Sequence, residues 1–312
     1  MNTGRQPLVS VVMATCDRTH FLGPTIDSVL KQSVEDLELV IADDGSGEAT
    51  CRVLHAWESD PRVRVLWLPH RGIPGAVRNV ALQAARGRYV AFQDSDDVWM
   101  PEKLASQLAA LAATPGARWC YTACEHIDSR GAPLALSHVD AWRAHSGDIR
   151  DAVACLRAHT ALPTVLVERD LLENAGFFDE RLRLFEDHDL WLRLACLSEV
   201  AVVPQPLVKV RRHDEHYSGR DQLAAAECRA TFLERAWGAP ISAAARAELR
   251  RIRALHAARV ARLRARSGDR RAARDSLRRS LREGWRYTRW WIDAAHVFLS
   301  APPLGERAVG RP

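Results

Sequence analysis

The chain has 312 residues, enough for one or two domains with a sizeable hydrophobic core. No run of about 18 apolar residues occurs, so the sequence offers no candidate membrane-spanning helix. The apolar stretch at residues 8–14 is too short for a secretory signal, and the seven cysteines are odd in number and irregularly spaced. We therefore expect a cytoplasmic protein.

The net charge of +5 conceals two parts of opposite charge. From residue 241 onward there are 18 arginines, no lysine and 6 acidic residues, whereas the first 240 residues carry 26 basic and 33 acidic residues. The basic part is therefore interpreted as a separate module that suits an anionic surface. It lacks a recognised nucleic-acid-binding motif, so a nucleic-acid partner is not expected.

Strand and helix patterns alternate over the first 125 residues. Apolar strands are predicted at residues 8–14, 37–42, 63–68, 89–93 and 119–123. The helices between them are predicted to end near residue 32, to cover 49–58 and 76–85, and to start at Pro101. The alternation predicts a mainly parallel sheet with helices on both faces. Ligands of such sheets bind beyond the carboxyl ends of the strands.

The most informative polar cluster is Asp94-Ser95-Asp96-Asp97, which directly follows a predicted strand. Carboxylates this close repel one another, and a bound divalent cation would relieve the repulsion. Oxygen ligands suit Mg²⁺ or Mn²⁺. The alternative is an acidic turn that caps the next helix.

Three other segments could contact a ligand. Residues 43–46 (Asp-Asp-Gly-Ser) offer carboxylates to a base or ribose, or else form a turn with a helix cap. Residues 71–79 form a glycine-containing loop that enters a helix and could hold an anion, with Arg78 clamping a phosphate or packing on a base. Glu186 and Asp187 start an amphipathic helix, where a carboxylate is ionised and could act as a general base or simply as an N-cap.

The pattern weakens over residues 126–160, which we expect to be rich in loops. Strands are predicted again at 164–168 and 199–210. After about residue 220 the chain is rich in Ala, Arg and Leu, with helical periodicity at 225–236, 243–267, 271–283 and 286–299.

Six segments, taken in order, resemble family 2 glycosyltransferases of the GT-A fold. They are residues 9–18, 42–46, 71–79, 92–99, 176–180 and 186–193, and the resemblance covers about residues 7–218. It implies a GT-A, Rossmann-like catalytic domain at 1–220 with a mainly parallel central sheet. The nucleotide would bind to about 1–125 and the acceptor to about 126–220. Residues 221–312 lie outside the resemblance and are expected to form a basic, α-helical C-terminal region.

The resemblance also implies roles for individual residues. It makes Thr15, Asp17 and Asp44 contacts to the base and ribose, and Arg78 a contact to the nucleotide. It makes Asp94-Ser95-Asp96 the family's Asp-x-Asp motif at the donor, with Asp96 the main metal ligand and Asp94 and Asp97 beside it. Asp187 would be the catalytic base, and His213 and Ser218 would close over the donor phosphates. His213 and His216 could instead bind a metal.

The implied reaction is inverting, metal-dependent sugar transfer from a nucleotide-diphosphate sugar, with UDP-sugars favoured, to an acceptor hydroxyl. The acceptor would be a carbohydrate, a lipid-linked glycan or a small molecule, as in the synthesis of cell-surface polysaccharide or a glycosylated metabolite. Cys16-Asp17 stands where Tyr-Asn is commoner, and Gln93 replaces an apolar residue, which leaves base and sugar preference open. The Gln-x-x-Arg-Trp motif of processive synthases is absent, which favours single addition.

Two other functions compete with this one. A nucleotidyltransferase should carry a Gly-rich, basic loop after its first strand, where this chain has Thr-Cys-Asp-Arg-Thr-His. A non-catalytic nucleotide-sugar-binding protein would need to have lost activity, which the intact carboxylates argue against. In the C-terminal region, aromatic residues between 285 and 298 lie beside many arginines. They suit peripheral contact with the inner face of the cell membrane, or else packing on the catalytic domain or a second subunit.

Overall fold

The computed structural model describes residues 6–134, 142–212 and 221–299. Its contacts divide the chain into two compact units, Met1–His216 and Tyr217–Pro312. The predicted donor contacts His213 and Ser218, and the alternative metal ligand His216, lie outside the described residues.

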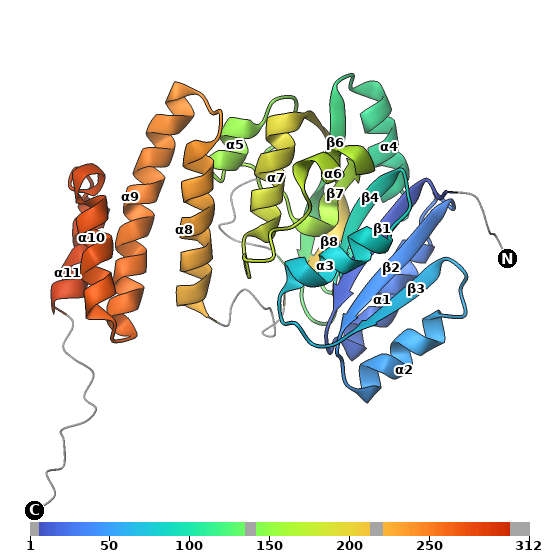
Figure 1. Cartoon of the computed structure of the whole chain (residues 1–312). Coiled ribbons are helices and arrows are strands. Elements are labelled where there is room, and N and C mark those ends of the chain that lie inside the picture. Colours follow the sequence, from blue (N-terminus) through green and yellow to red (C-terminus); the bar gives the residue numbers. More distant parts are fainter. Residues whose placement is uncertain (1–5, 135–141, 213–220, 300–312) are drawn as a thin grey trace, which may run out of the picture. The chain divides into compact units, whose positions relative to one another are not determined.

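The first unit is built on one eight-stranded sheet (Figure 1). Its strands are β1 (Val9–Thr15), β2 (Leu37–Asp44), β3 (Val63–Leu68), β4 (Tyr89–Asp94), β5 (Val98–Trp99), β6 (Ala117–Ile127), β7 (Val165–Glu168) and β8 (Glu199–Arg211). Their order in the sheet is β3-β2-β1-β4-β7-β6-β8-β5. Strand β1 pairs in parallel with β2 and β4, β2 pairs in parallel with β3, and β6 pairs in parallel with β8. Strand β7 is antiparallel to its neighbours β4 and β6, and β5 is antiparallel to β8. The parallel half therefore lies where alternation of strands and helices predicted it.

Helices cover the sheet and explain why its strands are so apolar. The helices of this unit are α1 (Thr19–Leu30), α2 (Glu48–Trp57), α3 (Pro74–Ala84), α4 (Lys103–Ala113), α5 (Arg150–Ala154), α6 (Arg169–Ala175) and α7 (Glu186–Leu197), with a 3₁₀ turn at Leu162–Thr164. All eight residues of β2 are buried, as expected for a parallel strand covered on both faces. The rings of Phe92, Trp119 and Trp191 pack together and fix α7 against β4 and β6.

The helix predicted from Pro101 begins two residues later, at Lys103. The segment before it is held by partners that are distant in sequence. Val98 and Trp99 form β5 on the edge of the sheet beside β8, and the Met100 carbonyl accepts a hydrogen bond of 2.7 Å from the Gln32 side chain. Because these contacts hold the chain extended, Pro101 lies in a turn and not at the first position of the helix.

The second unit consists of four helices within the described residues: α8 (Gln222–Gly238), α9 (Ala243–Arg266), α10 (Arg270–Gly284) and α11 (Thr288–Leu299). The side chains of Asp221, Ser242 and Asp269 accept backbone N–H bonds at the starts of the first three, which is why these helices begin there. The core between α9, α10 and α11 is mostly alanine, closed by Leu277, Trp290 and Val297. No helix of the described chain is long and apolar enough to cross a membrane.

We expect acid to destabilise the second unit through His256. This buried ring donates a hydrogen bond of 2.8 Å from Nε2 to the Ala226 carbonyl, and burial, with the charges of Arg229 and Arg259, lowers its pKa to about 4. Unfolding restores a pKa of about 6.5, so the unfolded chain binds more protons. The stability contributed above pH 6.5 is therefore lost as the pH falls toward 4, by up to about 3 kcal/mol.

The measurement is the free energy of unfolding of the full chain at several pH values. His256→Gln can keep the bond to Ala226 without titrating, so its stability should fall less between pH 6.5 and 4 than that of the wild type. Parallel pH profiles for the two proteins would exclude His256 as the cause.

Candidate functional site

The predicted ligand residues gather at the carboxyl edge of the parallel half of the sheet. Thr15 at the end of β1 is in register with Asp43 of β2, and Ala14 is in register with Asp94 at the end of β4. Three strand ends therefore meet at one edge, which is where a doubly wound sheet binds its ligand.

Three loops at this edge are tied together by two aspartates. Asp17, with a left-handed φ of 50°, accepts a bond of 2.8 Å from the Gly47 N–H, and its own N–H donates to the Ser46 hydroxyl. The Asp44 carboxylate accepts the N–H groups of Arg71 and Gly72 at 2.7 and 2.9 Å. In this structure Asp17 and Asp44 therefore fix the loops around the end of β2.

Arg78 lies at the centre of the site. It is nearly buried on α3 and donates to Glu186 Oε1 at the start of α7 and to Asp94 Oδ1 at the end of β4, both at 2.8 Å. Burial opposes its charge, but the two carboxylates more than offset this and raise the pKa of Arg78. The guanidinium therefore joins two carboxylates that lie 92 positions apart in the sequence.

The two carboxylates of this bridge both have raised pKa values. Burial raises the pKa of Glu186 to about 7 even though Arg78 opposes the shift, and the charge of Asp187 adds to it. Burial and the charge of Asp96 likewise raise the pKa of Asp94, again against Arg78. The negative charge at this edge is thus only partly compensated by the protein, which favours a bound cation.

The remaining aspartates of the cluster differ in their surroundings. Asp97 is buried and accepts the Arg211 N–H of β8 at 2.8 Å, and burial with the charges of Asp96 and Asp94 holds its pKa well above the usual value. Arg211 also donates from Nε to the Asp96 carbonyl, and the Ser95 carbonyl accepts from Thr25. The loop that follows β4 is thereby fixed to β8 and to α1.

Asp187 lies next to this bridge, at the first turn of α7. Its Oδ1 accepts two bonds from His188, from the backbone N–H at 2.7 Å and from the ring Nδ1 at 2.9 Å. These bonds and the charge of His188 outweigh burial and lower the pKa of Asp187. Phe185, just before the helix, has a left-handed φ of 65°, a strained conformation that sets the direction in which the first turn begins. Asp187 is thus held as a carboxylate, with both bonds on one oxygen.

Several buried polar atoms at this edge have no hydrogen-bond partner within the described structure. They are Thr15 Oγ1, Asp43 Oδ1, Arg78 Nε and Gln93 Oε1. Buried polar groups are normally satisfied, so their clustering here points to a polar ligand.

The metal-binding potential was expected from Asp94, Asp96 and Asp97. Among the residues that the structure describes, one set of three ligand atoms lies within 4.8 Å, and it belongs to Cys16, Asp44 and His70. His70 Nδ1 already bonds the Asp44 carbonyl at 2.9 Å, so this set has a structural explanation as a protein hydrogen bond. The oxygens of Asp94 and Asp96 are hard ligands that suit Mg²⁺ or Mn²⁺, whereas Asp97 is engaged with β8.

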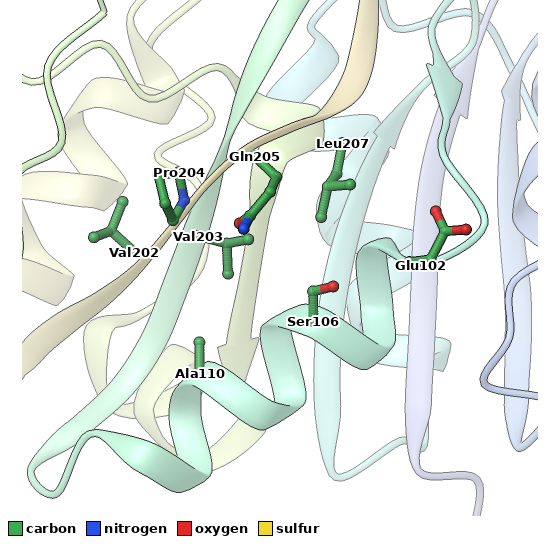
Figure 2. Close-up of a pocket in the computed structure, with 8 residues that line it drawn as sticks. All are labelled: Glu102, Ser106, Ala110, Val202, Val203, Pro204, Gln205 and Leu207. Carbon is green, nitrogen blue, oxygen red and sulfur yellow. The ribbon is translucent and has the colours of Figure 1, made fainter.

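A separate hollow of about 470 Å³ lies between α4 and β8 (Figure 2). It is lined by Glu102, Ser106, Ala110, Val202, Val203, Pro204, Gln205 and Leu207. None of these residues belongs to the predicted site, so the hollow adds nothing to the chemistry at the strand ends.

Sequence reasoning missed three residues that hold the site together. Glu186 was considered, with Asp187, as an ionised base or N-cap, but it pairs with Arg78 and its pKa is raised to about 7 by burial. His188 and Arg211 were given no role, although they bond Asp187 and Asp97 respectively. A charged residue within an apolar strand pattern, as Arg211 is at the end of β8, was the available signal.

Known proteins with similar sequences indicate the family of this chain. The sequence model described as glycosyl transferase family 2 matches residues 10–134. A protein of Bacillus subtilis, the putative teichuronic acid biosynthesis glycosyltransferase TuaG, is 31% identical over 215 residues, which are 64% of this chain and 81% of that protein. The chain belongs to glycosyl transferase family 2.

Solved structures show the fold. Residues 1–349 of Staphylococcus aureus TarS, in complex with UDP-GlcNAc, superpose with a TM-score of 0.62 at 19% identity, over 82% of this chain and 72% of that one. The mannosyltransferase PcManGT of Pyrobaculum calidifontis, in complex with GDP-Man and Mn²⁺, superposes with a TM-score of 0.58 at 19% identity, over 94% of this chain and 86% of that one. The expected GT-A fold with additional C-terminal helices is therefore confirmed.

This chain spans about a third of the length of several family 2 relatives that it matches. An uncharacterized glycosyltransferase of Rickettsia felis is 29% identical over 203 residues, which are 65% of this chain but 33% of that protein. The matched part is thus about a third of that protein.

Proposed function

We propose that the chain is an inverting glycosyltransferase that moves a sugar from a nucleotide-diphosphate sugar to an acceptor hydroxyl, with UDP-sugars as the favoured donors. The observation that carries this proposal is the Arg78 bridge, which places the Asp-x-Asp strand end beside the start of α7. The proposed site for the donor diphosphate would thereby adjoin the proposed base.

The donor would lie across the strand ends. Thr15 Oγ1 and Asp43 Oδ1 have buried hydrogen-bonding capacity there, and Asp17 and Asp44 hold the loops that would surround the base and ribose. The UDP-GlcNAc complex of TarS supports a UDP-sugar donor for a fold of this kind.

Asp96 and Asp94 would hold a divalent cation, Mg²⁺ or Mn²⁺, which would offset the charge of the diphosphate. The Mn²⁺ complex of PcManGT supports this choice of ion. In this arrangement Arg78 keeps Asp94 oriented through its terminal nitrogens, and its unpartnered Nε is the atom proposed to contact the nucleotide.

Asp187 would act as the base. Its Oδ1 is bonded to His188, so Oδ2 is the atom that would accept the proton of the acceptor hydroxyl. The hydroxyl oxygen forms a bond to the anomeric carbon on the face opposite the phosphate. The bond between that carbon and the phosphate oxygen breaks, and the nucleoside diphosphate leaves with the electron pair. One displacement inverts the anomeric configuration.

The acceptor is proposed to be a sugar of a cell-surface polysaccharide or a lipid-linked glycan. The relative TuaG is described as a teichuronic acid biosynthesis protein, which supports polysaccharide synthesis as the setting.

A donor screen tests the reaction. The full chain, with Mn²⁺ or Mg²⁺, is incubated with UDP-, GDP- and dTDP-sugars, and slow release of nucleoside diphosphate to water is measured. We expect one donor class to be hydrolysed, loss of release with EDTA, and recovery when the ion is restored. Proton NMR should show that an α-linked donor releases the β-anomer first.

The competing functions predict other results. A nucleotidyltransferase would release pyrophosphate from a nucleoside triphosphate and a sugar phosphate. A non-catalytic binding protein would bind a donor in a metal-dependent way without any release. Either result would replace the proposal.

A further inference from the structure

The second unit carries an exposed aromatic patch, which we define as Trp285, Trp291, Ile292 and Phe298. These side chains are 53%, 53%, 48% and 66% exposed. Such large apolar side chains are normally buried, and their gathering in one short segment is unusual for a protein surface.

The patch arises because α11 is apolar on two faces. Trp290, Ala294 and Val297 lie on one face and pack into the helical core. Trp291 and Phe298, seven residues apart, share a second face of the helix, Ile292 lies further round it, and all three are exposed. The buried face of α11 makes the packing contacts within the second unit, and the exposed apolar side chains do not take part in that core.

The end of α10 continues the patch. Trp285 follows the last turn of α10, and its carbonyl accepts a bond of 2.8 Å from Trp291 Nε1. Leu281, 44% exposed, lies four residues earlier on the same side of α10. The outer faces of the two helices therefore meet at the two tryptophans.

Arginines surround this apolar surface. Residues 270–299 contain eight arginines and three acidic residues, and seven of the eight arginines are exposed. Arg278 and Arg282 lie on the same side of α10 as Leu281 and Trp285, and the Arg286 guanidinium lies 5.4 Å from the centre of the Trp285 ring.

We propose that the aromatic patch and its arginines bind the surface of an anionic membrane. Tryptophan and phenylalanine suit the boundary between headgroups and acyl chains, and arginine pairs with lipid phosphates while its stem covers apolar surface. A helix pair that lies on the surface needs no membrane-spanning segment. The inference concerns only the second unit and does not depend on the transferase activity.

A vesicle flotation assay with the full chain tests the inference. Vesicles of phosphatidylcholine alone are compared with vesicles containing anionic phosphatidylglycerol. We expect binding to the anionic vesicles, weakened by added salt, together with a blue shift of tryptophan fluorescence. Trp291→Ser/Phe298→Ser should lower the partition coefficient about tenfold or more, and Arg282→Gln/Arg286→Gln should have an effect of about the same size.

The control variants replace an exposed tryptophan and an exposed arginine of the first unit. Trp67 is a 40% exposed tryptophan and Arg52 an exposed surface arginine, and neither belongs to the patch. Trp67→Ser and Arg52→Gln should float with anionic vesicles as the wild type does. Circular dichroism and donor release in solution check that the patch variants remain folded.

Three results would overturn the inference. The first is no binding to anionic vesicles, and the second is equal binding by patch variants and wild type. The third is a wild-type dimer that the patch substitutions convert to a monomer in the absence of lipid, because a second copy would then be the occupant of the patch.

Discussion

Asp187→Asn is expected to lower the rate of donor release, and of transfer to any acceptor, by about two to four orders of magnitude. The amide can still accept the bonds from His188 on its oxygen, so the geometry at the start of α7 should survive. What is lost is the oxygen that takes the proton. Because Asp187 is not expected to hold the donor, the dissociation constant for UDP measured by calorimetry should stay within a small factor of that of the wild type.

Asp148→Asn provides the control for this substitution. Asp148 pairs with Arg150 on the surface and has no place in the proposed site. It should leave release and binding unchanged. Near-normal turnover by Asp187→Asn, under conditions where the wild type is active, would remove Asp187 from the base role.

Arg78→Met is expected to have the largest effect on stability. It removes the partner of two carboxylates at once, and loss of one partner of a buried ion pair costs about 3–5 kcal/mol. Glu186 is the more buried of the two, and its pKa is already raised to about 7 with Arg78 in place. Without the guanidinium its pKa would rise further.

The pH dependence of this effect distinguishes charge from packing. In Arg78→Met the folded-state pKa values of Glu186 and Asp94 lie above their unfolded values, so the folded state binds more protons and stability falls as the pH rises. The difference in the free energy of unfolding between variant and wild type should therefore be larger at pH 8 than at pH 5. Arg150→Met, which breaks a surface pair, should cost less than about 1 kcal/mol. An equal loss for both variants would show that the Arg78 bridge does not stabilise the fold.

Part of the candidate site could be predicted from local sequence patterns. The strand ends at Thr15, Asp44 and Asp94 could be predicted, because apolar runs followed by polar clusters occur in order along the chain. That they lie at one edge followed from the rule for parallel sheets. The partners of Arg78 could not be predicted, because Glu186 approaches it only when α7 packs against β4 and β6.

The edge strand β5 also could not be predicted from the sequence. Val98 and Trp99 are too few to give a periodic signal, and they become β5 only because β8 lies beside them. Strand β7 likewise lies antiparallel between β4 and β6 because of how these distant segments pair. The four residues of β7 alone do not specify its direction in the sheet.

The sequence by itself determined the alternation of strands and helices, the acidic strand ends, the helix that starts at Glu186 and the family to which the chain belongs. These follow from local periodicity and from motifs of a few adjacent residues. Only the tertiary structure decided that Arg78 joins Asp94 to Glu186, that Asp97 bonds β8, and that α11 leaves Trp291 and Phe298 exposed. The physical reason is that burial and charge pairing are properties of residues brought together from distant parts of the chain, and they exist only once the helices have packed.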